Sequence, residues 1–388
     1  MLRALMRARY LMHVVAVAAC SATEPRAEGS ATPASSDALP GTGGAASTAG
    51  TSASFTTDPA STGTGTTGDG STGEPCALEV PGPRAASPYL FMLGGQAAWS
   101  HDDGFAAGWF HTYDALDVGG AGDLPHKVHV LLPRDYDACG PGYPVVYMND
   151  GDTSFWPGGA GDKTWDVAGG LAGLYAADAV PRVIVVAIVP NDREYEYSHT
   201  PGQPDSACCG VEQYTAYVAD HVRGFVDEHY NTRVDRESTA IIGSSRGGLA
   251  AFYLANRRPE VFGRAGCLSS SFWFGLDPVY GGEFPGGPLA ASALVQTLTD
   301  VLADPRVRPR LWIDWGLVRT GGFHNEVIEA AATVRGIEMV GLLGESYGYQ
   351  ADDLQDIVAE FAEEPAPNGE KVKPLRMKIS KAKERALM

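Results

Sequence analysis

The stretch from Ser238 to Gly248, STAIIGSSRGG, places a Gly-x-Ser-x-Gly turn centred on Ser245 directly after an apolar strand. An apolar helix is predicted to follow from 247 to 256. Small residues two before and two after a serine allow a sharp strand-to-helix turn, which lifts the side chain off the sheet. The chain has 48 glycines in 388 residues, so a Gly-x-Ser-x-Gly pattern can arise by chance. The predicted strand before the turn and the predicted helix after it are therefore the stronger evidence for a nucleophile turn. The alternative is a structural turn in which Ser245 only caps the helix.

The regions on either side of this turn alternate between strand and helix patterns. The β-branched run from 183 to 189 is typical of a strand covered on both faces, and the spacing of apolar residues from 211 to 229 is that of an amphipathic helix. This alternation predicts an α/β fold with a mostly parallel central sheet and helices on both faces. The carboxyl ends of the strands should share one rim. Further strands are predicted at 128–132, 144–148, 238–242, 264–268 and 311–315, and a further helix at 327–343.

Three blocks resemble the putative-esterase family of α/β hydrolases, which includes enterochelin-type siderophore esterases, feruloyl and acetyl-xylan esterases, esterase-D-like enzymes and mycolyltransferases. They are Pro144–Gly151, Gly243–Leu249 and Cys267–Trp273, and Asn149 stands where the family has a histidine. The resemblance implies the α/β-hydrolase fold and cleavage of carboxylic esters through an acyl-enzyme intermediate, without a cofactor. An acyltransferase of the same family and a catalytically weak binding module are the alternatives.

The resemblance also implies residue roles. Ser245 is expected to be the nucleophile, and the backbone N–H of Arg246 one donor of the oxyanion hole. The turn that contains Gly151 and Asp152 is expected to supply the second donor. The residues expected to line a substrate pocket are Trp156, Phe272 and Trp273, although Phe272 fits core packing equally well.

The general base and its orienting acid are harder to place. The strand at 311–315 fits the family's acid-bearing strand, but Arg319 stands at the usual acid position, which leaves Asp314 or Glu326. Asp314 also fits a purely structural role. The family's Gly-x-His block is missing from 351–369, and His324 is the only histidine after Ser245. We therefore expect His324 to be the base, with a pocket-lining or helix-capping histidine as the alternative.

The ends of the chain differ in character from its centre. Residues 1–20 resemble a lipoprotein signal, with arginines, a short apolar stretch and a lipidation site at Cys20. This predicts an exported protein, held by a lipid anchor at a bacterial outer membrane or cell surface and facing the periplasm or the exterior; an ordinary cleavable signal is the alternative. The expected organisation continues with a disordered Ser/Thr/Gly/Ala/Pro-rich linker at 21–75, the hydrolase domain at 76–365 and a basic tail at 366–388. The tail is either a solvated extension or the product of a frameshift or truncation that removed the histidine block.

The charge and the cysteine content of the chain limit which ligands and partners are expected. The net charge of −18 argues against nucleic acid, and a small-molecule or polysaccharide ester is the expected substrate. Export permits disulfides, so four loop cysteines are expected to form two bridges of open connectivity, while Cys267 is expected to be a buried free thiol. No metal site is expected, because the sequence His101-Asp102-Asp103 is only a weak signal. The four loop cysteines are Cys76, Cys139, Cys208 and Cys209.

Overall fold

The computed structural model describes residues 78–85, 87–120, 122–159, 164–202, 208–277, 286–315, 323–350 and 354–358. From Leu78 onward these residues belong to one compact unit. The expected signal segment with Cys20, the linker and the basic tail lie outside the described residues. No helix within the described ranges combines the length and apolar character needed to cross a bilayer.

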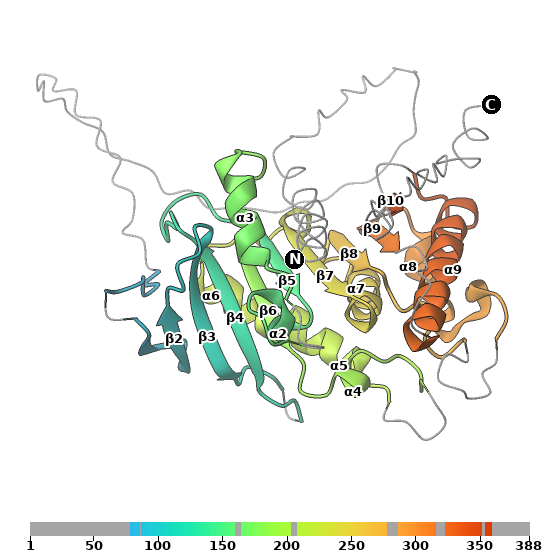
Figure 1. The fold of residues 1–388 in the computed structure, drawn as a ribbon, viewed down its shortest axis with the longest axis horizontal. Helices are drawn as coiled ribbons and strands as arrows, with labels where there is room; N and C mark the ends of the chain where they lie inside the picture. Colours follow the sequence, from blue (N-terminus) through green and yellow to red (C-terminus); the bar gives the residue numbers. More distant parts are fainter. Residues whose placement is uncertain are drawn as a thin grey trace, which may run out of the picture. The chain divides into compact units, whose positions relative to one another are not determined.

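Ten strands of the described chain form one sheet in the order β1-β2-β3-β4-β6-β5-β7-β8-β9-β10 (Figure 1). Strands β6, β5, β7, β8, β9 and β10 pair in parallel, whereas β1 to β4 pair antiparallel with one another and β4 with β6. From β3 onward this is the strand order of the α/β-hydrolase fold, as expected from the sequence. The bounds are β1 Tyr89–Leu93, β2 Gln96–His101, β3 Gly108–Leu116, β4 His126–Pro133, β5 Val145–Met148, β6 Ile184–Val189, β7 Thr239–Ser244, β8 Arg264–Leu268, β9 Arg310–Trp315 and β10 Leu354–Val358.

The central strands are covered on both faces. In β6, Ile184, Val186 and Ile188 enter one apolar cluster, while Val185 and Ala187 enter the other. Successive side chains of a strand point to opposite faces, so an uninterrupted apolar run is buried only where helices cover both. The first cluster includes residues of α5 to α9, and the second includes residues of α3.

The helices occupy the connections between strands. The helix expected at 211–229 is present, but its middle, η1, is π-helical. The helix expected at 327–343 is also present and is longer at both ends. The bounds are α2 Gly151–Ser154, α3 Val167–Ala176, α4 Arg193–Glu196, α5 Val211–Ala216, η1 Tyr217–Val222, α6 Arg223–His229, α7 Arg246–Arg257, α8 Ala293–Ala303 and α9 Phe323–Glu345, with 3-10 turns at Arg236–Ser238 and Leu289–Ala291.

The cysteines agree with the expectation where the structure describes them. Cys267 is free and buried, and burial raises the pKa of its thiol. Cys208 and Cys209 are bonded to each other, and Cys139 is disulfide-bonded. Three of the four loop cysteines are therefore disulfide-bonded, and Cys76 lies outside the described residues.

Candidate active site

The predicted sharp turn at Ser245 is present between β7 and α7. Ser245 has φ 57° and ψ −120°, a conformation that costs a non-glycine residue about 1–3 kcal/mol and persists only where its surroundings hold it. Its N–H donates to the carbonyl of Leu268 (2.9 Å), and its carbonyl accepts from the N–H of Ser271 (3.0 Å). The loop after β8 thus fixes the turn from both sides.

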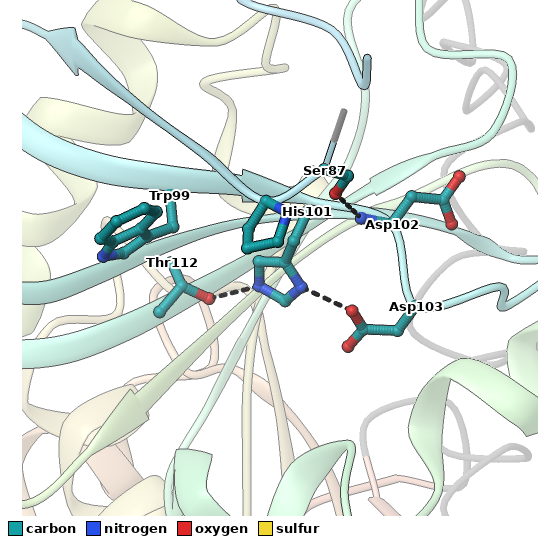
Figure 2. A pocket seen from close by; sticks show the side chains of 7 residues that line it. Ser87, Trp99, His101, Asp102, Asp103 and Thr112 are labelled. Carbon is teal, nitrogen blue, oxygen red and sulfur yellow. Dashed lines mark hydrogen bonds and ion pairs between the residues drawn. The ribbon is translucent and has the colours of Figure 1, made fainter. Parts of the chain in front are cut away.

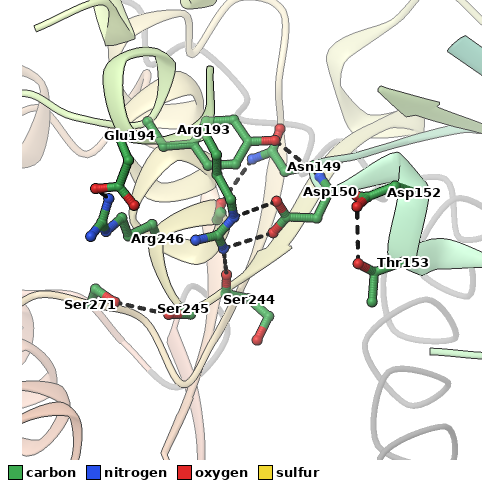
Figure 3. Close-up of polar contacts among 12 residues, drawn as sticks. Asn149, Asp150, Asp152, Thr153, Arg193, Glu194, Ser244, Ser245, Arg246 and Ser271 are labelled. Carbon is green, nitrogen blue, oxygen red and sulfur yellow. Dashed lines mark hydrogen bonds and ion pairs between the residues drawn. The ribbon is translucent and has the colours of Figure 1, made fainter. Parts of the chain in front are cut away.

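The Ser245 hydroxyl lies beside another hydroxyl. Its Oγ is 3.2 Å from Oγ of Ser271, a residue that is 1% exposed (Figure 3). Within the described part of the chain, no histidine side chain hydrogen-bonds to Ser245. The Ser271 hydroxyl is therefore the local partner of the expected nucleophile.

The turn after β5 is held against the elbow by an ion pair. Asp150 adopts the left-handed conformation (φ 58°) immediately before α2, and its carboxylate accepts two hydrogen bonds from Arg193, at 2.7 and 2.9 Å. Arg193 also donates to the carbonyl of Ser244 at 3.3 Å, as Figure 3 shows. One guanidinium thus joins the turn before Gly151 to the residue before Ser245.

The first N–H groups of a helix lack intrahelical acceptors, and they favour negative charge. Gly151 begins α2, and a Cβ on it would lie 2.8 Å from the backbone of Ala187, so only glycine fits there. Arg246 begins α7. Both expected oxyanion donors therefore sit at helix starts next to the elbow, while the side chain of Asp152 is exposed.

Asn149, which replaces the family's histidine, ties β5 to α7. Its Nδ2 donates to the carbonyl of Gly247 at 2.8 Å, and its Oδ1 accepts from the hydroxyl of Tyr214 at 2.9 Å. Both contacts are buried. The residue is a structural tie between the two turns of the site.

The side chain of Arg246 is nearly buried beside the elbow. Its guanidinium forms an ion pair with Glu194 and lies over the ring of Phe274, 4.7 Å from the ring centroid. Its side chain is 9% exposed, whereas that of Glu194 is 62% exposed. A paired positive charge therefore flanks the expected nucleophile.

Asp314 braces a neighbouring loop. It lies near the end of β9 and is 4% exposed, and its Oδ1 accepts from the N–H of Ser269 at 2.7 Å and from its hydroxyl at 3.4 Å. This holds the loop that carries Ser271. His324 falls in the first turn of α9, after β9. Its side chain, like those of Arg319 and Glu326, lies outside the described residues, so the expected pairing of Asp314 with His324 stays a prediction.

The three expected pocket residues occupy different surroundings. Phe272 is 2% exposed and packs edge-to-face on Phe252 of α7, with ring centroids 5.2 Å apart. Trp273 is 3% exposed and lies beside Phe274, at 5.9 Å. The ring of Trp156 packs on His129 of β4, at 4.8 Å, and on the neighbouring strands β2 and β3. Phe272 therefore has the surroundings of a core residue, and Trp156 packs against the antiparallel part of the sheet.

One histidine at this site was not expected. His199 follows α4, in the connection after β6, and its ring lies against Phe274, with centroids 6.5 Å apart. Burial lowers the pKa of His199 to about 4, so its ring is neutral at pH 7. Its Nδ1 is buried and makes no hydrogen bond to the described residues. The signal that could have found it is its position in a rim loop rather than in a strand or helix.

Metal binding has no support in the described residues. No three His, Cys, Asp or Glu side chains converge there in a way that would hold an ion. The ring of His101 instead hydrogen-bonds to Asp103 at 2.8 Å and to Thr112 at 2.9 Å.

Comparison with known proteins places this arrangement in a family. The sequence profile described as "Putative esterase" matches residues 123–322. "Uncharacterized protein YbbA" of Bacillus subtilis is 25% identical over 151 residues, which cover 37% of this chain and 56% of that protein. "Endo-1,4-beta-xylanase/feruloyl esterase" of Xylanibacter ruminicola is 28% identical over 152 residues, covering 36% of this chain and 19% of that protein. The chain thus spans about half or less of the length of these relatives.

Several solved structures are also similar to this chain, at low sequence identity. The enterobactin esterase FES of Shigella flexneri is 16% identical with a TM-score of 0.42, covering 64% of this chain and 52% of that chain. A ferulic acid esterase is 17% identical with a TM-score of 0.42, covering 64% of this chain and 88% of that chain. The profile match extends over more than half of the 388 residues and includes the elbow, so the chain belongs to the putative-esterase family of α/β hydrolases.

Proposed function

We propose that this domain hydrolyses carboxylic esters through an acyl-enzyme formed on Ser245. The observation that carries the proposal is the strained backbone of Ser245, held between two helix starts. Strain of this kind at a solvent-accessible serine is typical of a nucleophile elbow. Family membership supports the same chemistry.

In this mechanism, Ser245 Oγ attacks the ester carbonyl while an imidazole takes its proton. The N–H groups of Arg246 and Gly151 hold the oxyanion, and each such donor contributes about 3–4 kcal/mol to lowering the barrier. The imidazole then gives the proton to the departing alcohol. Water attacks the acyl-enzyme, with the imidazole again as base, and releases the carboxylic acid.

Two histidines are candidates for the base. His324 follows β9 and comes after Ser245 and Asp314 in the chain, although one helix and one strand before the family's usual histidine position. His199 lies in the loop after β6 against Phe274. Burial lowers the pKa of His199 to about 4, so a base at this position stays deprotonated well below pH 6. A profile of kcat/KM that stays flat down to about pH 5 supports His199 as the base, and a profile that falls at higher pH excludes it.

The substrate class in this proposal is an ester of a small acyl or aromatic acid, borne by a small molecule or by a polysaccharide. The relative from Xylanibacter ruminicola is called a feruloyl esterase, which supports the polysaccharide branch. The net charge of −18 disfavours polyanionic carriers.

A binding module is the second candidate function. It is favoured by one observation: Ser245 Oγ meets the hydroxyl of Ser271, not an imidazole, within the described residues. In that case the site would bind an ester ligand without turning it over, because a serine hydroxyl without a base is a weak nucleophile.

Labelling with a fluorophosphonate distinguishes the two functions. We expect labelling of the folded protein that Ser245→Ala abolishes and Ser271→Ala retains, together with hydrolysis of short p-nitrophenyl esters. His199→Ala and His324→Ala should differ, with the variant that lacks the base losing turnover. Folded protein that binds an ester but shows neither labelling nor turnover would support the binding module instead.

We also propose export and lipid anchoring through Cys20. The support is the charged and apolar pattern of residues 1–20. Metabolic incorporation of a labelled fatty acid into the full chain, lost in Cys20→Ser, is the expected result. Unlabelled protein released into the medium would contradict it.

A further inference from the structure

A shallow pocket of about 310 Å³ opens beside the antiparallel strands β2 and β3 (Figure 2). It shares no residue with the elbow, the turn after β5 or the loop after β8. We call it the β2 pocket. The lining side chains labelled in Figure 2 are Ser87, Trp99, His101, Asp102, Asp103 and Thr112.

The apolar wall of the β2 pocket is an exposed indole. Trp99 is 39% exposed, and its Nε1 already donates to Asp114 at 3.1 Å, so the ring face is what it offers to a ligand. Its cross-strand partner on β1 is Leu90, and Met92 lies two residues further along. Directly paired residues and every second residue share one face of a sheet, so these three side chains form one strip. Leu90 is 57% exposed and Met92 61% exposed.

The polar wall offers mainly acceptor oxygens. The Asp102 carboxylate accepts from Arg134. The backbone N–H of Asp102 donates to Ser87 Oγ at 3.0 Å, which leaves the Ser87 hydroxyl hydrogen free to donate to a ligand. Asp103 accepts from Trp156 Nε1 at 2.7 Å and bonds the ring of His101. A carboxylate has about four lone-pair sites, so both retain acceptor capacity for ligand hydroxyls.

Two of the three carboxylates around the pocket have cationic partners. Asp102 forms an ion pair with Arg134, and Asp114, which holds the indole, lies 3.3 Å from Lys127. Asp103 instead bonds the His101 ring and the Trp156 N–H, so most of the negative charge is offset and an anion would meet acceptor oxygens. An aromatic face next to charge-balanced acceptors suits a neutral ligand that has both an apolar face and many hydroxyl groups.

We infer that the β2 pocket and the strip formed by Leu90, Met92 and Trp99 bind a neutral sugar ring within a polysaccharide chain. The ring stacks its C–H face on Trp99 and donates hydroxyls to Asp102 and Asp103. The pocket volume is at the lower end of the range for small-ligand sites, which fits one ring rather than a larger ligand. This inference rests on the proposed function in one respect: the bound glycan is taken to carry the ester that the domain hydrolyses.

The pocket is also connected to the candidate active site through one side chain. Trp156, which donates to Asp103, comes five residues after Gly151 in the chain. A glycan held at the β2 pocket would thus contact Asp103, which is hydrogen-bonded to the segment that follows the expected oxyanion turn. This makes the β2 pocket a site for the carrier of the ester rather than for its acyl group.

The test uses the full chain carrying Ser245→Ala, titrated with neutral xylo- and cello-oligosaccharides and followed by calorimetry and tryptophan fluorescence. We expect saturable binding that Trp99→Ala weakens about tenfold or more and that Trp99→Phe largely restores. Val307→Ala, an exposed apolar position (38%) in the loop before β9, should leave binding unchanged.

The inference would be overturned by no binding of any neutral oligosaccharide, or by binding that Trp99→Ala leaves intact. Preference for tetramethylammonium over neutral sugars would also overturn it, since that would make the pocket a cation site. Fluorophosphonate labelling of the chain with Ser245 intact separates the failures. Labelling without sugar binding refutes only this inference, and sugar binding without labelling refutes only the esterase proposal.

Discussion

The ion pair between Arg193 and Asp150 is expected to control both the stability of the site and its activity. The Asp150 side chain is only 7% exposed, so Arg193→Met leaves a nearly buried carboxylate without its partner. Breaking a buried pair in this way costs about 3–5 kcal/mol of unfolding free energy. Arg193 is itself 31% exposed, and water can reach that side of the pair, so we expect a cost at the lower end, about 3 kcal/mol.

Removing the other partner should cost less. Asn tolerates the left-handed backbone that Asp150 adopts, and Arg193 keeps solvent and the carbonyl of Ser244 as alternative partners. Asp150→Asn should therefore cost about 1.5–2 kcal/mol, at the lower end of the range for a hydrogen bond to a charged group. In the double variant no unpaired buried charge remains, so its cost should fall about 2 kcal/mol short of the sum of the two single costs.

The same change should slow catalysis, because Asp150 immediately precedes Gly151. A displaced Gly151 N–H amounts to the loss of one oxyanion donor, about 10²–10³ in kcat, with a smaller change in KM. Urea denaturation measures the stabilities, and hydrolysis of p-nitrophenyl acetate measures kcat.

A surface pair provides the matched control. Arg257 pairs with Glu212, and the two side chains are 48% and 56% exposed, so Arg257→Met should cost no more than about 1 kcal/mol and leave kcat unchanged. The reasoning would be refuted if the stability costs of Arg193→Met and Asp150→Asn added up in the double variant, or if Arg193→Met left kcat undiminished.

Two further predictions concern acid stability and the fit of the elbow. Burial lowers the pKa of His111 to about 4 and that of His129 to about 3. The unfolded chain, with pKa values of about 6.5, then binds more protons below that pH. Burial also lowers the pKa of His199 to about 4, so three rings contribute. Stability should fall on acidification by about 1.4 kcal/mol per pH unit for each ring between about pH 6 and 4, a slope that His129→Phe should reduce by about a third in urea titrations. In Gly247→Ala, the new Cβ would lie 2.6 Å from Asp150 Oδ2 and 3.3 Å from the Cβ of Asn149. We expect a loss of about 1–3 kcal/mol and greatly reduced fluorophosphonate labelling, and unchanged labelling would show that the turn after β5 is not needed.

Five of the six parallel strands, β5 to β9, could be predicted because each is a short, mostly apolar run between turns. The sixth, β10, was not predicted, since Gln355 and Asp356 interrupt its apolar pattern. The strand at 183–189, for example, differs from observed β6 by only one residue. The antiparallel strands β1 to β3 could not be found this way. In β3, His111 and Thr112 interrupt the apolar pattern, yet both are buried. His111 is satisfied by Tyr230 and by the carbonyl of Pro81, at 2.9 and 2.8 Å, and partners so distant in sequence leave no periodic signal.

The candidate site was predictable where one chain segment determines it. The elbow at Ser245 and the turn at Gly151 each depend on local glycines and a preceding strand, so the sequence shows them directly. Arg193, Glu194 and His199 were missed because they come from the loop after β6. Only the strand order, in which β6 lies next to β5 and β5 next to β7, brings that loop to the elbow. Sequence spacing carries no information on that adjacency.

The replacement of the family's histidine by Asn149 is best understood through the hydrogen bonds that this position makes. A neutral imidazole offers one donor and one acceptor, and Asn149 uses its side-chain amide in the same way, donating to the Gly247 carbonyl and accepting from Tyr214. Both partners are buried, so a residue lacking either function would leave an unsatisfied group at a cost of about 1–3 kcal/mol. The position therefore requires a bifunctional hydrogen-bonding side chain that joins β5 to α7, and it requires no titratable group. This departure from the family pattern keeps β5 joined to α7 beside Gly151 and Ser245, and in the proposed mechanism a histidine at another position takes the proton.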